Sequence, residues 1–149
     1  MKKNVAVLES LRRGQADPLP VMEHFYTLQG EGAWTGEPAY FVRLAGCDVG
    51  CHWCDVKESW KVDPEQYIPS STIADWAYNS GTQRVVITGG EPTIYDLGLL
   101  TEAFHQKNLK VHMEPAGVHS LTGDIDWLCL SPKKFLPPKD GFYPHADEL

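Results

Sequence analysis

The sequence has no apolar run of membrane-spanning length, no cluster of basic residues, no internal repeat and no low-complexity segment. A spanning helix needs about 20 consecutive apolar residues, so the first absence argues against a membrane protein. Contacts with nucleic-acid phosphates need grouped Lys and Arg side chains, so the second absence argues against direct nucleic-acid binding. With a formal net charge of −7, the protein is expected to have a small molecule as its partner.

A secretory signal is also missing from the sequence. Lys2 and Lys3 lead only into a short apolar stretch at 5–8, without the longer apolar core and cleavage site of a signal peptide. We therefore expect a cytoplasmic protein whose cysteines stay reduced and free to bind metals. The 149 residues, 42% of them hydrophobic, are predicted to form a single domain, 1–149, in which residues 1–20 are a weakly patterned, variable lead-in.

Strand-like and helix-like segments alternate along the chain, which is typical of βαβ units. Strands are predicted at 21–28, 39–44, 84–88, 110–113 and 127–130, and helices near 70–80 and 97–107. Thr72 and Asp75 are spaced as a capping box at the start of the first helix. The pattern predicts an α/β fold with a parallel sheet, curved as in a partial barrel, and a ligand site at the carboxyl ends of the strands.

Three of the four cysteines, Cys47, Cys51 and Cys54, form a C-x3-C-x2-C run. Three thiolates can hold three irons of a cubane cluster, which leaves the fourth iron without a protein ligand. Because clusters that only carry electrons usually have four cysteine ligands, the run predicts a [4Fe-4S] cluster whose open iron binds another molecule. The alternative is zinc, completed by His52 or Cys129, although zinc sites usually show paired spacings. Cys129 lies in an apolar stretch and is interpreted as a buried thiol.

A second motif, Gly89-Gly90-Glu91-Pro92, follows the strand predicted at 84–88. Glycines let the backbone approach a ligand closely, and the Glu91 carboxylate can accept a hydrogen bond from a ligand ammonium. Taken alone, the motif is also an ordinary turn of α/β proteins. The cysteines, this turn, Glu114 and Ser131 all follow predicted strand ends, which indicates one shared active site.

The cysteine spacing resembles that of the radical S-adenosylmethionine (SAM) enzymes, in which SAM chelates the open iron. Further motifs resemble, more narrowly, the 7-carboxy-7-deazaguanine synthase family, in the same order from about residue 21 to 149. The most discriminating motif is Gln29-Gly30-Glu31-Gly32, since few other radical SAM branches share it. The remaining motifs are the strand Phe41–Cys47, the cysteine triplet, Asp55, Gly89–Pro92, Glu114 and Ser131-Pro132-Lys133.

The resemblance implies a partial (β/α) barrel of the radical SAM type and a lyase of queuosine biosynthesis, the pathway of a tRNA modification. The family converts 6-carboxy-5,6,7,8-tetrahydropterin to 7-carboxy-7-deazaguanine with release of ammonia, and it regenerates SAM. An external low-potential electron donor and a homodimer are implied as well. The sequence ends at Leu149, soon after a proline-rich loop, so we expect a family fold shortened at the C-terminus.

The same resemblance assigns roles to individual residues. The cluster ligands are Cys47, Cys51 and Cys54. The residues assigned to SAM are Trp53, Gly89, Gly90, Glu91, Glu114, Ser131 and Lys133. The residues assigned to the substrate are Gln29, Gly30, Glu31, Gly32, Arg43 and Thr88. Without the resemblance, Arg43 reads as a strand residue paired with a surface acid, Glu31 as a turn residue and Trp53 as a packing residue. Glu114 then reads as an acid that caps a strand end.

Two positions depart from the family pattern. Val56 stands where many members have a hydroxyl residue that helps to bind Mg2+, so a requirement for Mg2+ is in doubt. Our hypothesis is that the Lys57 ammonium replaces the cation near the substrate carboxylate. Pro115, Ala116 and Gly117 follow Glu114 where the family commonly has a polar residue, which removes one expected SAM contact.

Three other functions remain open on the sequence. An activating protein of glycyl-radical enzymes has the same cluster motif but is expected to lack the segment Gln29–Gly32. A non-catalytic metal-binding or electron-transfer domain would fill the fourth iron position with a protein ligand. An inactive, truncated piece of the synthase would bind the cluster but turn over poorly.

Overall fold

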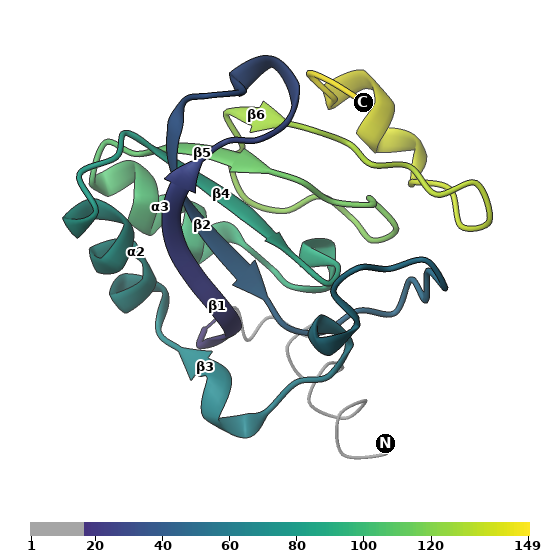
Figure 1. Ribbon diagram of the computed structural model, residues 1–149, viewed down its shortest axis with the longest axis horizontal. Coiled ribbons are helices and arrows are strands. Elements are labelled where there is room, and N and C mark those ends of the chain that lie inside the picture. The colour runs from purple at the N-terminus through teal and green to yellow at the C-terminus, as the bar shows by residue number, and fades with distance from the viewer. Residues whose placement is uncertain (1–16) are drawn as a thin grey trace.

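A six-stranded sheet in the order β3-β1-β2-β4-β5-β6 forms the centre of the structure (Figure 1). The structure is a computed structural model and describes residues 17–149. The parallel strands are β2 (Pro38–Leu44), β4 (Arg84–Gly89), β5 (Lys110–Met113) and β6 (Trp127–Leu128). The antiparallel strands are β1 (Leu19–Leu28), which pairs with β2, and β3 (Tyr67–Ile68), which pairs with β1.

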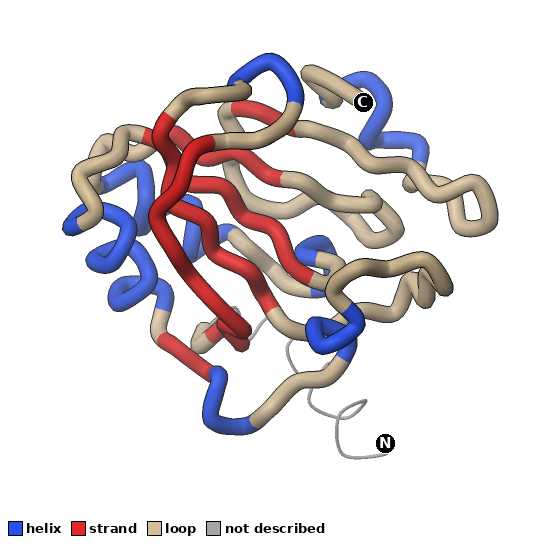
Figure 2. Tube along the Cα trace, viewed as in Figure 1, coloured by secondary structure: helices blue, strands red, loops and turns tan. Residues whose placement is uncertain are grey.

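Two α-helices, α2 (Ser70–Asn79) and α3 (Gly98–Gln106), lie on the same side of the sheet (Figure 2). Both bury apolar side chains at helical spacing, as Ile73 and Ala77 do in α2 and Leu100 and Phe104 do in α3. Short 3-10 helices occur in the loops: η1 (Gly32–Trp34), η2 (Lys57–Trp60), η3 (Pro64–Gln66), η4 (Pro92–Ile94) and η5 (Asp140–His145). Between residues 17 and 149, no helix has the length and apolar content needed to cross a membrane.

The two faces of the sheet differ in how they are covered. Successive side chains of a strand point to opposite faces, so each strand contributes to both. Toward the helices, Val42, Ile87 and Val111 are fully buried in the main core. The opposite face has only a small apolar cluster, made of Ala39, Phe41 and Val86. This helix-free face is therefore the one that can hold a ligand.

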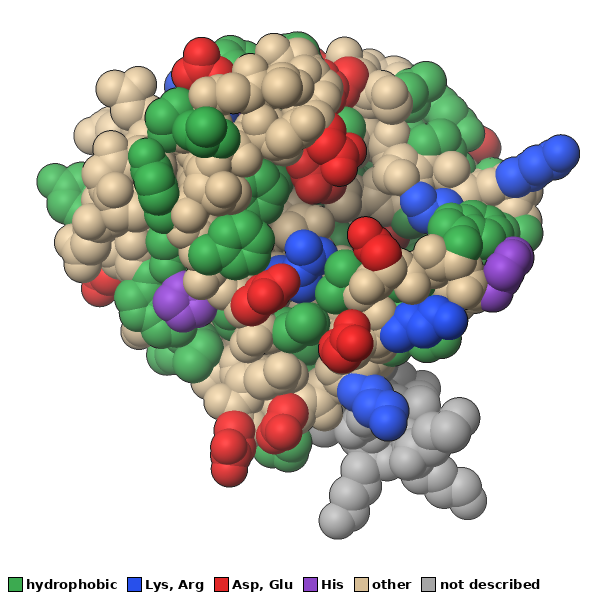
Figure 3. Space-filling model, viewed as in Figure 1, with side chains coloured by type: hydrophobic (Ala, Val, Ile, Leu, Met, Phe, Trp, Pro, Cys, Tyr) green, Lys and Arg blue, Asp and Glu red, His purple; other side chains and the backbone are tan. Residues whose placement is uncertain are grey.

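Polar side chains gather on the helix-free face at the carboxyl ends of the parallel strands. Arg43 of β2 is in register with Thr88 of β4, and Glu114 follows β5 directly. On the face of the molecule in Figure 3, acidic and basic side chains are interspersed with hydrophobic ones. The strand ends thus supply mixed hydrogen-bonding groups, which suits a polar small molecule.

The predicted strands and helices are confirmed with small changes in their bounds. The prediction of a parallel sheet is wrong for β1, which pairs antiparallel with β2, and the short antiparallel strand β3 was not predicted. The connection from β1 to β2 contains no α-helix, so β2 returns directly alongside β1. Residues 1–16 of the predicted lead-in lie outside the described residues, and its last two residues, Leu19 and Pro20, belong to β1.

The predicted capping box of α2 is wrong. The N-cap residue is Pro69, which makes no side-chain capping bond, and the N–H of Ser70 donates instead to Oδ1 of Asp17, at 2.6 Å. Asp75 instead forms an ion pair with Lys107, which follows α3, with 2.8 Å between Oδ1 and Nζ. A capping box does occur just upstream, between Asp63 and Gln66 of η3. The acidic residue of α2 therefore joins the two helices rather than capping its own.

Candidate active site

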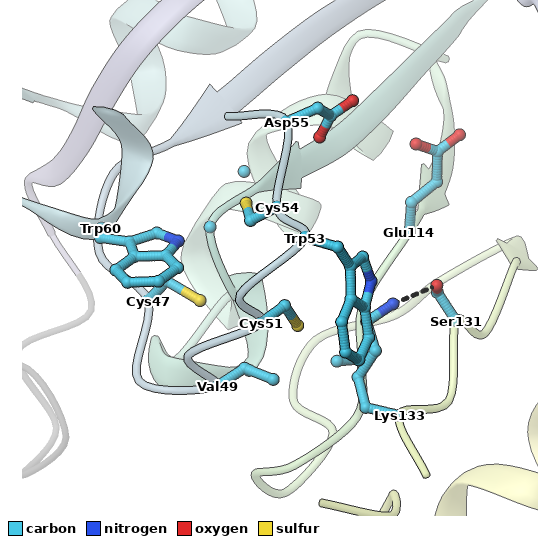
Figure 4. Close-up of a pocket in the computed structure, with 13 residues that line it drawn as sticks. Cys47, Val49, Cys51, Trp53, Cys54, Asp55, Trp60, Glu114, Ser131 and Lys133 are labelled. Carbon is cyan, nitrogen blue, oxygen red and sulfur yellow. Dashed lines mark hydrogen bonds between the residues drawn. The ribbon is translucent and has the colours of Figure 1, made fainter. Parts of the chain in front are cut away.

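A cavity of about 400 Å3 lies at the carboxyl ends of β2, β4 and β5. Its wall combines the cysteine loop after β2 with the glycine turn that ends β4 (Figure 4). Glu114, Ser131 and Lys133 complete the wall from the segments that follow β5 and β6. The structure thus brings together, in one place, most of the segments that the sequence assigns to one site.

All three clustered cysteines line this cavity with free thiols. Burial raises the pKa of the Cys47 thiol, although the backbone N–H groups of Val49 and Gly50 hydrogen-bond to its sulfur and oppose the shift. Within residues 17–149, no three His, Cys, Asp or Glu side chains come close enough to share one metal ion. Thiols that stand apart around one cavity suit a cluster of several irons better than a single zinc ion.

Neither candidate for a fourth zinc ligand is among the residues that line the cavity. The His52 ring is exposed and packs edge-on against Trp53, with 4.5 Å between ring centroids. Cys129 is half-buried rather than fully buried, and burial together with the nearby Glu148 carboxylate raises the pKa of its thiol to about 12. Because Cys129 does not line the cavity, it is better described as a structural residue.

The glycine turn touches the cysteine loop through the backbone. Gly90 donates its N–H to the carbonyl of Leu44, at 3.1 Å, and Glu91 donates its N–H to the carbonyl of Gly46, at 3.0 Å. A Cβ atom on Gly90 would lie 2.3 Å from the Gly46 oxygen and 2.7 Å from the Cβ of Cys47. Glycine at this position is therefore required for the turn to approach the cysteine loop at all.

The Glu91 side chain is fully buried behind the turn and is not among the residues that line the cavity. Its two oxygens accept hydrogen bonds from the backbone N–H groups of Thr93, at 3.1 Å, and Ala116, at 2.8 Å. Burial raises the pKa of this carboxyl, and the two backbone donors partly offset that rise. The carboxylate joins the turn to the segment after β5, while its assigned contact with SAM stays a prediction.

The residues assigned to the substrate form a connected group on the helix-free face. The Gln29 amide donates to the Glu114 carboxylate, at 3.0 Å, and its oxygen accepts the backbone N–H of Glu31, at 3.3 Å. Arg43 pairs with Glu23, at 2.7 Å, and donates from Nη1 to the Gly89 carbonyl, at 3.4 Å. Glu114 connects this group to the cavity, because its side chain lines the wall. Burial raises the pKa of the Glu114 carboxyl.

Ser131 and Lys133 form the opposite part of the wall. The Lys133 ammonium donates to the Ser131 hydroxyl, at 2.6 Å, and both lie beside Trp53 (Figure 4). The Trp53 ring packs edge-on against the exposed Phe135, with 5.4 Å between centroids. This side of the cavity thus offers an aromatic surface, a hydroxyl and a cation to a ligand.

The family model of the radical SAM superfamily matches residues 41–129, more than half of the chain, and this range includes the cysteine loop and the glycine turn. The chain belongs to the radical SAM superfamily. This family implies a [4Fe-4S] cluster and SAM, and the free thiols of Cys47, Cys51 and Cys54 on one cavity wall fit that cluster.

Individual relatives agree with this radical SAM assignment. The 7-carboxy-7-deazaguanine synthase of Flavobacterium psychrophilum is 47% identical over 135 residues, which cover 91% of this chain and 64% of that protein. The enzyme of the same name from Synechocystis sp. is 46% identical over 133 residues, which cover 87% of this chain and 62% of that protein. The chain therefore spans less than two thirds of the length of these relatives.

A solved structure is also similar. The crystal structure of QueE from Escherichia coli superimposes with a TM-score of 0.81 and 30% sequence identity, covering 94% of this chain and 72% of that one. The predicted α/β fold of the radical SAM type and the resemblance to the 7-carboxy-7-deazaguanine synthases are thus confirmed.

Several residues at this radical SAM site were not predicted from the sequence. Asp55, Trp60 and Ala116 line the cavity. Asp55 belongs to the motifs of the resemblance but was assigned no role, and Ala116 lies two residues after Glu114, so their place is a consequence of those motifs. Glu148 carries no sequence signal, because its contact is with a turn far away along the chain.

Glu148 fixes the turn that contains Gln29 and Glu31. Its carboxylate accepts the backbone N–H of Ala33, at 2.9 Å, and its own backbone N–H donates to the carbonyl of Leu128 in β6, at 3.2 Å. Gly32 has a φ of +71°, and a Cβ atom there would lie 1.8 Å from Oε1 of Glu148. Gly32 is therefore needed both for its backbone conformation and to admit this carboxylate.

This contact predicts energetic coupling between Gly32 and Glu148. Gly32→Ala should lower the free energy of unfolding by about 2–3 kcal/mol, through backbone strain and displacement of Glu148. Glu148→Ala should cost about 1 kcal/mol, and the double variant should cost about 1 kcal/mol less than the sum of the two. Urea denaturation followed by circular dichroism measures all three values.

Gly36→Ala is the matched control, since Gly36 has a φ of +87° in the same turn but no atom within 4 Å of an added Cβ. Its cost should add to that of Glu148→Ala without coupling. Additive costs for Gly32→Ala and Glu148→Ala would contradict the proposed contact.

Proposed function

We propose that the protein is a radical SAM lyase that converts 6-carboxy-5,6,7,8-tetrahydropterin to 7-carboxy-7-deazaguanine with release of ammonia. The observation that carries the proposal is the position of Glu114. Its carboxylate lines the cysteine cavity and accepts a hydrogen bond from Gln29, so the discriminating Gln-Gly-Glu-Gly turn adjoins the site of radical chemistry. The names of the relatives from Flavobacterium psychrophilum and Synechocystis sp. support the same reaction.

Cys47, Cys51 and Cys54 would hold the [4Fe-4S] cluster. When bound, the cluster and SAM supply the one-electron chemistry that removes a hydrogen atom from the substrate. In our proposal, the backbone at Gly89 and Gly90 approaches the methionine end of SAM. Trp53, Ser131 and Lys133 bind SAM from the opposite wall, with the Lys133 ammonium available to a carboxylate. The task of these residues is to hold the reacting carbon in place and to exclude water.

The substrate would lie on the helix-free face beside this cavity. The paired Gln29 amide and Glu114 carboxylate offer the donors and acceptors that a pterin edge needs. Arg43 is oriented by Glu23 and by the Gly89 carbonyl, so a substrate carboxylate bound by its guanidinium would lie next to the cavity.

The turn that carries Glu31 offers further room to the substrate. A Cβ atom on Gly30 would meet no protein atom within 4 Å, so packing inside the chain does not require glycine there. This supports the assignment of Gly30 to a close approach between backbone and substrate. Thr88 is buried between Arg43 and Glu114, and we assign its hydroxyl to the same binding group. An external electron donor and a homodimer, expected from the resemblance, belong to this proposal as well.

An anaerobic assay tests the proposed reaction. The cluster is reconstituted, and SAM, a reductant and 6-carboxytetrahydropterin are added before mass spectrometry of the products. We expect 7-carboxy-7-deazaguanine from the wild type and from Cys129→Ala, and neither product nor bound iron cluster from Cys51→Ala. Cleavage of SAM without this product would point to another substrate, such as the protein partner of a glycyl-radical activating enzyme. Absence of SAM cleavage by a fully loaded cluster would indicate a non-catalytic domain.

The role of Mg2+ is a separate part of the proposal. Asp55 lines the cavity, whereas the exposed Lys57 is not among the residues that line it, so replacement of the cation by Lys57 stays a prediction. If the hypothesis is right, added Mg2+ should change the rate less than twofold, and Lys57→Ala should lower kcat/KM about tenfold, since a charge pair near a substrate contributes on the order of 1–2 kcal/mol. Lys61→Ala, at a nearby exposed lysine, is the control. A steep rise with Mg2+ together with an unaffected Lys57→Ala variant would reject the hypothesis.

A further inference from the structure

Trp60 carries a hydrogen-bond donor that has no acceptor. Its indole Nε1 is buried from solvent and has no partner within the part of the chain that the structure describes. Other buried side-chain atoms between residues 17 and 149 also have no hydrogen-bond partner. Of the residues that carry such atoms, only Trp60 lines the cysteine cavity. A buried N–H group without a partner costs about 1–3 kcal/mol, so the site is expected to supply an acceptor when it is complete.

The position of Trp60 is fixed by the backbone beside Cys47. The carbonyl of Ser59 accepts the N–H of Gly46, at 2.6 Å, which ties the residue before Trp60 to the residue before Cys47. The buried Ser59 hydroxyl in turn donates to the carbonyl of Val56, at 2.6 Å. Trp60 and Cys47 line the same cavity, and in the view of Figure 4 the indole nitrogen is on the ring edge directed toward the cysteine side chains.

The acceptor is best identified by elimination within the cavity. The two carboxylates of the cavity wall, Asp55 and Glu114, do not accept this N–H in the structure. The Cys47 sulfur already accepts hydrogen bonds from the backbone N–H groups of Val49 and Gly50. In a loaded site, the inorganic sulfides of the cluster would lie on the side of the cavity formed by the cysteine loop, toward which the indole nitrogen is drawn in Figure 4.

We propose that the Trp60 indole N–H donates a hydrogen bond to a sulfur of the bound [4Fe-4S] cluster and thereby raises its reduction potential. The reduced cluster carries one more negative charge than the oxidised one, so a donor near its sulfurs stabilises the reduced state more. The inference rests on the cluster part of the proposed function and is independent of the substrate.

The first test is a redox titration of the reconstituted chain, followed by electron paramagnetic resonance. Trp60→Phe keeps most of the ring volume and removes the donor. We expect its equilibrium constant for one-electron reduction to fall about tenfold, which corresponds to a midpoint about 59 mV more negative. Trp127→Phe removes an indole N–H that is likewise buried without a partner but does not line the cavity, and it should leave the midpoint unchanged. An unchanged midpoint in Trp60→Phe, or an equal shift in both variants, would overturn the proposal.

The second test starts from the wild-type protein, so its decisive result does not depend on a folded variant. In wild-type protein labelled with 15N-tryptophan, pulsed electron paramagnetic resonance of the reduced cluster should detect a coupled 15N nucleus. The coupling should persist in Trp53→Phe and vanish in Trp60→Phe. A reduced cluster without any 15N coupling in the wild type rules out the hydrogen bond. Iron content and product formation are measured on the same samples, so a failure of the proposed function is recognised separately.

Discussion

The backbone contact between the end of β4 and the loop after β2 determines where the cysteines lie. Two hydrogen bonds, from Gly90 to Leu44 and from Glu91 to Gly46, hold the two segments together directly before Cys47. The contact is possible only because Gly90 has no side chain, since a Cβ atom would overlap the Gly46 carbonyl. The glycine turn therefore has a structural task, in addition to any contact with a ligand.

Buried polar groups then extend this contact to the rest of the site. Tyr95 donates its hydroxyl to the Ala45 carbonyl, at 2.5 Å, and Glu91 accepts two backbone N–H groups from opposite sides of the turn. These bonds lie where an unpaired polar group would be costly, so they favour one arrangement of the loops. The cysteine loop, the glycine turn and the segment around Ala116 are consequently held together by bonds within the protein.

The sequence predicted well those features that follow directly from the chemistry of one residue type. The apolar run Val85–Ile87 predicted a buried strand, and the three closely spaced cysteines, which were predicted to bind a cluster, line one cavity. It was a poor guide to strand direction, because alternation of side chains is the same in parallel and antiparallel pairs. The capping box failed because α2 begins at Ser70, so Thr72 lies inside the first turn and is not the N-cap residue.

Contacts between distant segments were beyond the reach of the sequence. Nothing in the motif around Gly32 indicates that its missing side chain admits Glu148. Trp60 likewise follows no periodic pattern, and its importance rests on an unpaired N–H group that only a structure reveals. The assigned roles of Arg43 and Glu91 depend on ligands, so their contacts within the protein explain how they are oriented without testing those roles.

The central claim is that one iron of a three-cysteine cluster is open to SAM. The most direct measurement is electron–nuclear double resonance of the reduced cluster with SAM labelled by 15N at the amino group and 17O at the carboxylate. Our account predicts that both labels couple to the cluster, because SAM occupies the open iron. A cluster that shows neither coupling and has four protein ligands, or a purified protein that holds a single zinc ion at these cysteines, would contradict it.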